Sequence, residues 1–337
     1  MILFLGGNQR PLTTSPMISS KPKIPVLAST PNAIVKSRQK KILIASSWRS
    51  GSTFLGDFFS HYPSTYYVYE PFKFFKDNDG SIANISKSLN LLKNLYGCQF
   101  FRASVKEYLY LKYKDKDQQR KFNADPYDQW SKCSNSPNIV IKTVRLRLES
   151  IEEFLLDTNF YLILLVRDPR GVKNSRLKQI WCRIQPKCID TSSICTDLSS
   201  DTDAILRYKV KYPQNVMLVR YEDLTFKPYE TVYRMVAFLQ LPTDYTKINN
   251  YLALHTGKTQ NGQDVSKSEL LHRYKRIFGY TMRQNPLKQV FKWTEQLNQT
   301  DIVQIENLCA KPMNVLGYNT FQNNQTDLKT LIKSSEV

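Results

Sequence analysis

The segment that most constrains the fold is residues 41–54, KILIASSWRSGSTF, in which an apolar run passes through a short Ser/Gly loop into a helix-compatible sequence. Leu55, Phe58 and Phe59 follow at helical spacing and are expected to face a core. A strand, a tight loop and a helix in this order point several backbone N–H groups and a helix N-terminus at one place. We therefore expect an α/β fold with an anion site in this loop.

Similar apolar runs recur along the chain. They are continuous rather than alternating, which is typical of strands buried on both faces, and the long stretches between them suit helical crossovers. The predicted architecture is a central parallel sheet of about five strands flanked by helices. The expected strands are 41–46, 65–69, 138–143, 161–166 and 215–220.

The composition divides the chain into three parts. Residues 1–40 are predicted to be a flexible stem or linker because residues 8–40 are rich in Pro, Ser, Thr and Lys. Residues 41–321 are predicted to form one domain, and the polar residues 322–337 a disordered tail. The N-terminal apolar run is too short for a spanning helix, so any membrane attachment is expected to need an N-terminal anchor that this sequence lacks.

The charge balance predicts an anionic partner. The chain has 48 Lys and Arg against 29 Asp and Glu, a formal net charge of +19, and such a surface attracts polyanions. No nucleic-acid recognition motif accompanies the charge, so no nucleic acid is expected as a partner. Acidic disordered and collagen-like classes are excluded by the same composition.

The cysteines and sequons bear on metal binding and compartment. Six cysteines without a CxxC pair and only three histidines make a zinc site unlikely on chemical grounds, and we expect no metal. An even cysteine count fits disulfides of a secretory-pathway protein, although free thiols remain an alternative and the pairing is open. Sequons begin at Asn84, Asn298 and Asn324.

The first motif can be compared with the nucleotide-binding pattern GxxxxGK[ST]. Gly51 and Thr53 match it, whereas Ser52 stands in place of the lysine. Without that lysine the loop is poorly suited to a triphosphate with Mg²⁺, which argues against a kinase or NTPase, but it can bind one terminal phosphate. Arg49 supplies a cation within the loop.

A second motif lies in residues 161–176, YLILLVRDPRGVKNSR. A buried strand is predicted to end at Arg167, and Ser175 falls two turns into the helix that follows. Open α/β sheets bind ligands at the carboxyl edge, so these two side chains are expected to converge on a second anion, which implies a bis-phosphorylated nucleotide. The alternative is that Arg167 pairs with Asp168.

Taken together, the two motifs resemble those of the carbohydrate sulfotransferases, most closely the branch that sulfates 6-hydroxyls of galactose, N-acetylgalactosamine or N-acetylglucosamine. The resemblance extends over about residues 41–320 and implies the P-loop-like sulfotransferase fold. It is carried further by YVYEP (67–71), IKTVRL (141–146), VRYEDL (219–224) and the C-terminal run 291–318.

The resemblance also implies a donor and its contacts. The donor would be 3′-phosphoadenosine 5′-phosphosulfate (PAPS), with no metal required. Arg167 and Ser175 would hold its 3′-phosphate, and Arg283 would lie near the nucleotide. Its 5′-phosphosulfate would be held by the loop residues Arg49, Ser50, Gly51, Ser52, Thr53 and Phe54.

Glu70 is the expected catalytic base. It follows the second predicted strand at the carboxyl edge, where a carboxylate can take a proton from an acceptor hydroxyl, and the alternative is a structural ion pair. His61 is the competing base but is expected to be a surface or capping residue. Lys142 and Arg145 are expected to meet the sulfonate or the acceptor, or else simply to end a strand.

The predicted function, as the resemblance implies, is transfer of a sulfuryl group from PAPS to a hydroxyl, the 6-hydroxyl, of a glycan such as a glycosaminoglycan in the Golgi lumen. The alternative is an inactive glycan-binding protein with the same fold. Acceptor specificity is expected in loops at 72–137 and 177–205, and residues 221–223 are expected to be structural.

Overall fold

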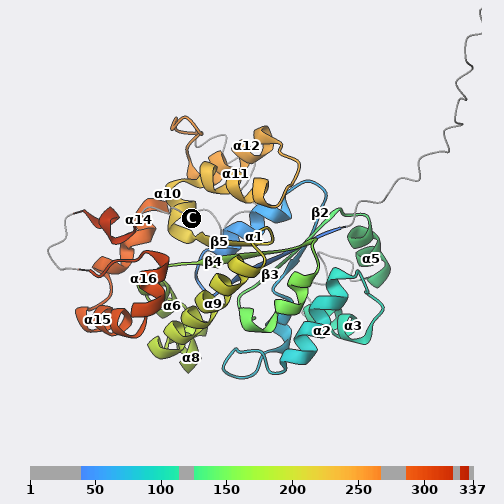
Figure 1. The fold of residues 1–337 in the computed structure, drawn as a ribbon, viewed down its shortest axis with the longest axis horizontal. Helices are drawn as coiled ribbons and strands as arrows, with labels where there is room; N and C mark the ends of the chain where they lie inside the picture. The colour runs from blue at the N-terminus through green and yellow to red at the C-terminus, as the bar shows by residue number, and fades with distance from the viewer. Residues whose placement is uncertain (1–38, 114–124, 267–285, 322–326, 334–337) are drawn as a thin grey trace, which may run out of the picture. The chain divides into compact units, whose positions relative to one another are not determined.

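The computed structural model describes residues 39–113, 125–266, 286–321 and 327–333 (Figure 1). Five parallel strands form one sheet in the order β2-β3-β1-β4-β5, as the apolar runs predicted. The strands are β1 (Lys40–Ser46), β2 (Thr65–Tyr69), β3 (Asn138–Thr143), β4 (Phe160–Val166) and β5 (Val216–Arg220).

Both faces of the sheet are covered by helices, which explains the continuous apolar runs. One face, which includes Leu43 and Leu162, belongs to one core cluster, and the other, which includes Ile42 and Ile163, belongs to a second. The helices of the first cluster include α2 (Ile85–Tyr96), α3 (Ala103–Tyr113), α9 (Thr191–Lys211), α15 (Gln299–Leu308) and α16 (Ala310–Leu316). Those of the second include α1 (Ser52–Ser60), α11 (Pro228–Phe238) and α12 (Tyr245–Thr256).

The two segments expected to be loops contain helices, so that expectation was wrong. Within 72–137 lie α2, α3, most of η1 (Pro71–Phe75) and α5 (Pro126–Ser134), and within 177–205 lie α7 (Ile180–Arg183), α8 (Pro186–Ile189) and the first part of α9. The remaining helical elements are α6 (Pro169–Leu177), α10 (Tyr221–Phe226), α14 (Pro286–Phe291), η2 (Leu148–Ser150), η3 (Glu152–Leu156), η4 (Lys292–Glu295) and η5 (Leu328–Leu331).

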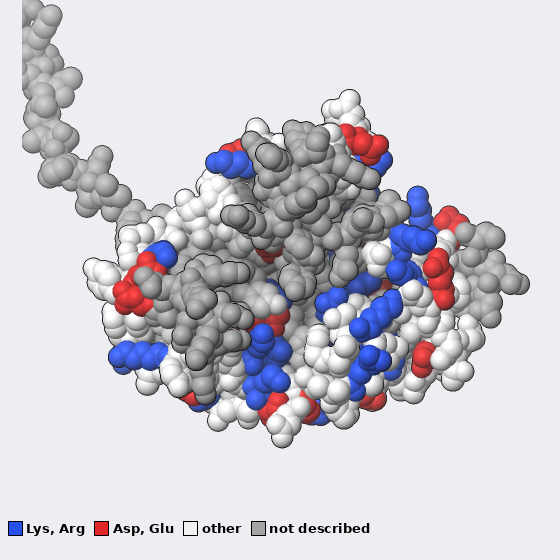
Figure 2. Space-filling view, turned by 180° about the vertical axis from the view of Figure 1, so that it is seen from behind, with Lys and Arg blue, Asp and Glu red and all other residues white. Residues whose placement is uncertain are grey.

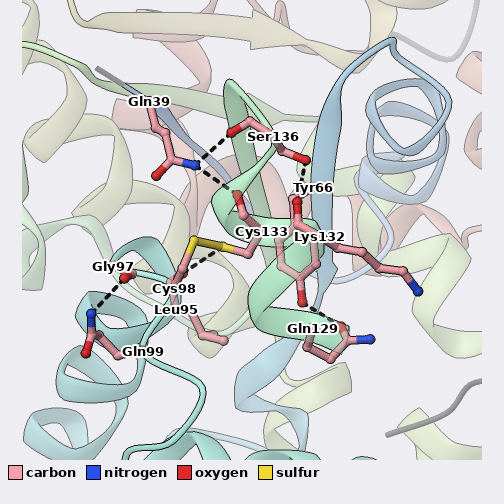
Figure 3. Close-up of a disulfide and its surroundings, with 10 residues drawn as sticks. All are labelled: Gln39, Tyr66, Leu95, Gly97, Cys98, Gln99, Gln129, Lys132, Cys133 and Ser136. Atoms are coloured by element: carbon pink, nitrogen blue, oxygen red, sulfur yellow. Dashed lines mark hydrogen bonds between the residues drawn. A yellow bond between two sulfur atoms is a disulfide. The ribbon is translucent and has the colours of Figure 1, made fainter. Parts of the chain in front are cut away.

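All six cysteines form disulfides: Cys98–Cys133, Cys182–Cys188 and Cys195–Cys309. Figure 3 shows that the first joins the turn after α2 to α5. In the same place the Gln39 amide donates to the carbonyls of Cys133 and Ser136 over 2.9 and 2.7 Å, which ties the start of β1 to the end of α5. Across the described ranges, no helix combines the length and apolar character needed to span a bilayer.

Candidate active site

The loop between β1 and α1 turns through two left-handed residues. Arg49 has φ of 71° and Gly51 has φ of 91°. A Cβ on Gly51 would lie 2.5 Å from Cδ2 of Tyr221, so both the backbone conformation and the close approach require glycine here. The turn lets α1 begin at Ser52, with its N-terminal N–H groups at the carboxyl edge of the sheet.

The second motif meets this loop. Arg167, at the end of β4, donates from its two terminal nitrogens to the carbonyls of Arg49 and Gln289, each over 3.1 Å. Its guanidinium lies 4.4 Å from the centroid of the Tyr221 ring. Arg49 Nε in turn donates to the Ser175 hydroxyl of α6 over 3.1 Å. The two motifs, which are about 120 residues apart in sequence, are therefore in direct contact.

The alternative pairing of Arg167 with Asp168 does not occur. Asp168 instead caps α6 by accepting from the Arg170 N–H, and its carboxylate binds the Arg170 guanidinium at 2.7 Å. Arg170 is also bound to Glu306 at 2.6 Å and is fully buried. The Asp168 carboxylate is thus paired with Arg170 and not with Arg167. Among the described residues, the hydrogen-bond partners of Arg167 are neutral backbone carbonyls.

A cavity of about 360 Å³ opens where the two motifs meet. The cavity is lined by seven of the nine expected cofactor residues, namely Arg49, Gly51, Ser52, Thr53, Phe54, Arg167 and Ser175. Ser50 is not part of the lining, because it is buried and its hydroxyl is hydrogen-bonded to that of Ser47 over 2.8 Å. Arg283 lies outside the described residues.

The cavity is strongly cationic. Lys178 and Lys292 join Arg49 and Arg167 in its lining, and none of the described lining residues is Asp or Glu. Burial lowers the pKa of Lys178, and the nearby positive charges of Lys292 and Arg167 lower it further. Figure 2 shows Lys and Arg side chains gathered around a hollow on one face of the molecule. Such a concentration of positive charge favours an anionic ligand.

Several lining residues were not identified from the sequence. Tyr221 was expected to be structural, but it lines the cavity and stacks on Arg167. Its position directly after a predicted strand, at the carboxyl edge, was a usable signal. Lys178 lies three residues after Ser175, and helical spacing could have linked the two. Gln289 and Lys292 carried no signal, because only the tertiary fold brings them to the cavity.

The neighbours of Tyr221 are structural, as expected. Glu222 is fully buried, where it accepts from the Asp168 N–H over 3.1 Å and from the Tyr318 hydroxyl over 2.8 Å. Burial, together with the negative charge of Asp168, raises the pKa of Glu222 to about 7. Asp223 pairs with Arg220 at 2.7 Å.

Glu70, Lys142 and Arg145 come together in a second cluster, which we call the Glu70 cluster. Glu70 Oε1 lies 2.5 Å from Lys142 Nζ, and its Oε2 contacts a terminal nitrogen of Arg145. Burial raises the pKa of Glu70, but the charges and hydrogen bonds of Lys142 and Arg145 outweigh it, so the pKa lies below its usual value. The ion pair that was the alternative for Glu70 is therefore present, and none of the three lines the cavity.

Arg49 connects the two regions electrostatically. Burial is the main cause of a lowered pKa at Lys142, which the Glu70 charge opposes and the charges of Arg145 and Arg49 reinforce. A direct contact joins them as well, because the Arg145 guanidinium lies 5.3 Å from the centroid of the Trp48 ring in the loop between β1 and α1. His61, in contrast, is an exposed residue that caps the C-terminus of α1, as expected.

In the parts of the chain that the structure describes, no group of three or more His, Cys, Asp or Glu side chains is placed to hold a metal ion.

A parallel α/β sheet whose carboxyl edge carries two cationic motifs around one cavity is an arrangement typical of proteins that bind anionic ligands. The family model "Sulfotransferase domain" matches residues 39–317, and the chain belongs to this family. The expected P-loop-like sulfotransferase fold, and the expectation of an enzyme, are thereby confirmed.

The resemblance to carbohydrate sulfotransferases is confirmed as well. Carbohydrate sulfotransferase 1 of Mus musculus is 23% identical, over 87% of this chain and 82% of the relative. Carbohydrate sulfotransferase 3 of Mus musculus is 22% identical, over 83% of this chain and 68% of the relative. Among solved structures, the sulfotransferase domain of the Synechococcus PCC 7002 olefin synthase has a TM-score of 0.49 and 15% identity, covering 84% of this chain and 96% of that one.

Proposed function

We propose that the protein transfers the sulfuryl group of PAPS to a hydroxyl, the 6-hydroxyl, of a glycan sugar. The observation that carries the proposal is the meeting of the two cationic motifs in one cavity without a described carboxylate in its lining. PAPS has two separate anionic groups, on the 3′ and 5′ oxygens of its ribose, and it supplies an activated sulfuryl group attached to a phosphate leaving group.

In this proposal each motif holds one anionic end of the donor. The loop N–H groups and the N-terminus of α1 bind the 5′-phosphosulfate, and Arg49 stabilises the negative charge that develops on the leaving phosphate. Arg167 and Ser175 bind the 3′-phosphate. Because Arg167 is anchored by neutral carbonyls, it keeps its full positive charge for the ligand. These donors neutralise the phosphates without a metal ion.

Glu70 is proposed as the base that takes the proton of the acceptor hydroxyl. Its lowered pKa keeps it ionised at neutral pH, and Lys142 and Arg145 fix the direction of its carboxylate. The contact of Arg145 with both Glu70 and the Trp48 ring supports a position of this base beside the loop that would hold the donor. The acceptor hydroxyl would then enter between Glu70 and the loop.

The acceptor is proposed from the net charge of the chain and from the similar proteins, and the compartment from its disulfides. A formal net charge of +19 suits an acidic glycan such as a glycosaminoglycan, and the similar proteins named above are carbohydrate sulfotransferases. Three disulfides suit an oxidising compartment such as the Golgi lumen. Asn84 and Asn298, which begin two of the sequons, are exposed and suitable for glycosylation.

Calorimetric titration with 3′-phosphoadenosine 5′-phosphate (PAP) tests the donor site. PAP should bind without a metal ion, and more tightly than ADP or ATP with Mg²⁺, because only PAP has the 3′-phosphate. Incubation with PAPS and a panel of unsulfated chondroitin and N-acetyllactosamine oligosaccharides should then yield sulfated product, and mass spectrometry of the product locates the sulfate. Absence of PAP binding would refute the donor assignment.

A second candidate function is glycan binding without turnover. It is favoured by the complete pairing of Glu70 with two cations and by the absence of Glu70 from the cavity lining. The same experiment separates the two functions. Binding of both PAP and a glycan, with no sulfate transfer by the wild-type protein, would support the inactive form.

A further inference from the structure

Three apolar side chains are exposed on the short helix α7 and at Ile184, the residue that caps its C-terminus. Ile180 is 72% exposed, Ile184 is 74% exposed and Trp181 is 39% exposed. Ile180 and Ile184 are four residues apart and so share one side of the helical turn. Apolar side chains gathered on a surface are a mark of a binding site when their surroundings hold them in place.

Two contacts hold the α7 segment against the loop between β1 and α1. The Cys182–Cys188 disulfide closes the turn formed by α7 and α8. Arg176 of α6 is buried, and it donates from Nε to the Trp48 carbonyl over 3.1 Å and from NH1 to the Cys188 carbonyl over 3.0 Å. One guanidinium thus joins the loop to the segment that carries the exposed side chains.

The same segment lies between the cavity and the Glu70 cluster. Lys178 and Gln179, directly before α7, line the cavity. Trp181 meets the Trp48 ring edge-on, with centroids 6.0 Å apart. The guanidinium of Arg145, which binds Glu70, lies 5.3 Å from the centroid of that same Trp48 ring. Contacts therefore run from the donor cavity through the two tryptophans to the proposed base.

We propose that Trp181, Ile180 and Ile184 bind the apolar face of a sugar ring of the acceptor glycan. A pyranose presents C–H groups on one face, which stack well on an indole, while its hydroxyls stay in solvent. The position beside both the donor cavity and Glu70 makes the acceptor the expected occupant. The inference rests on the proposed function, since it needs an acceptor glycan.

Steady-state kinetics of Trp181→Ala test the assignment, with the oligosaccharide that the wild-type protein sulfates best as the probe. The acceptor KM should rise about 10-fold, with kcat and the PAP dissociation constant within two-fold of wild type. Trp181→Phe should restore most of the affinity because it keeps an aromatic face. Ile184→Ser, which changes a largely exposed side chain and so should fold normally, should raise KM about three-fold.

Tyr110→Ala is the matched control, because Tyr110 is an aromatic residue that is 65% exposed on α3, and its KM should equal that of wild type. A wild-type KM in both Trp181→Ala and Ile184→Ser would overturn the assignment. An equal loss of PAP affinity and acceptor affinity would also overturn the assignment. It would mean that Trp181 only supports the loop between β1 and α1. If the wild-type protein transfers no sulfate at all, the proposed function itself fails, and this result is distinct from an active enzyme that is insensitive to Trp181.

Discussion

Arg167 and Glu70 both follow strands at the carboxyl edge of one sheet, yet the groups that hold their charged side chains differ: neutral groups hold Arg167, and cations hold Glu70. Arg167 is held by two backbone carbonyls and an aromatic ring, which fix its position without cancelling its charge. Glu70 is held by two cations, which fix its position and enclose its charge. A charged group anchored by neutral partners can attract a ligand, whereas opposite charges around a carboxylate fix its direction but make it a weaker base. A role of Glu70 as the base therefore depends on its position and not on a raised pKa.

The Arg170 cluster shows that pairing alone does not indicate catalysis. Arg170 binds Asp168 and Glu306 and lies 4.2 Å from the centroid of the buried Trp293 ring. Like the Glu70 cluster, it is buried and ion-paired, and like that cluster it does not line the cavity. What distinguishes the Glu70 cluster is its contact with the loop between β1 and α1, where the Arg145 guanidinium lies 5.3 Å from the centroid of the Trp48 ring. Four measurements test the different roles of Arg167 and Glu70.

The largest effect is expected from Glu70→Gln, which keeps the shape of the side chain but cannot take a proton. The value of kcat should fall about 1,000-fold while the PAP dissociation constant stays within two-fold of wild type. Glu306→Gln is the matched control, since it changes a carboxylate paired with an arginine away from the cavity, and its kcat should stay near wild type. Turnover of Glu70→Gln within ten-fold of wild type would remove the base assignment.

Arg167→Ala should have the next largest effect. Loss of its charged contact with the 3′-phosphate should weaken PAP binding about 100-fold, as measured by calorimetry. Adenosine 5′-phosphosulfate has no 3′-phosphate, so its binding should change much less. Arg207→Ala on α9, which replaces an exposed arginine, should leave both affinities unchanged. Equal losses for both ligands would show that Arg167 only supports the loop.

A smaller effect is expected from Ser175→Ala. The hydroxyl is uncharged and accepts from Arg49 over 3.1 Å, so its removal should weaken PAP binding about five-fold, the cost of one neutral hydrogen bond. The affinity for adenosine 5′-phosphosulfate should be nearly unchanged, which calorimetry can check. A loss as large as that of Arg167→Ala would mean that Ser175 mainly positions Arg49.

The smallest effect is expected from acidification of the wild-type protein. Because Lys142 and Arg145 outweigh burial and lower the pKa of Glu70, the base should stay ionised as the pH falls, and kcat at saturating substrates should be flat between about pH 8 and pH 5. The PAP dissociation constant measured over the same pH range shows whether protonation of the ligand phosphates changes donor binding, so that this effect can be separated from kcat. A fall in kcat centred near pH 6.5 would instead indicate a histidine base.

The sequence predicted the sheet well because its signals are local. The ranges 65–69 and 138–143 agree with β2 and β3, since each is a short β-rich run bounded by turn or loop residues. The helices in 177–205 were missed because α9 begins with a run of Ser, Thr and Asp, which are weak helix formers. Ile205 and Tyr208 pack in the core, and this tertiary packing stabilises α9 in spite of its composition.

The sequence by itself determined the parallel α/β sheet and the glycine turn before α1, because each depends on periodicity or on a backbone conformation within a short segment. Seven residues of the cavity lining were named from the two motifs and from their resemblance to the carbohydrate sulfotransferases. The tertiary structure alone decided the disulfide pairing, the neutral anchors of Arg167 and the cations around Glu70. It also brought Tyr221 and Lys292 to the cavity. Apart from the Cys182–Cys188 disulfide, these contacts join residues that are far apart in the chain, and only folding of the whole domain brings their side chains together.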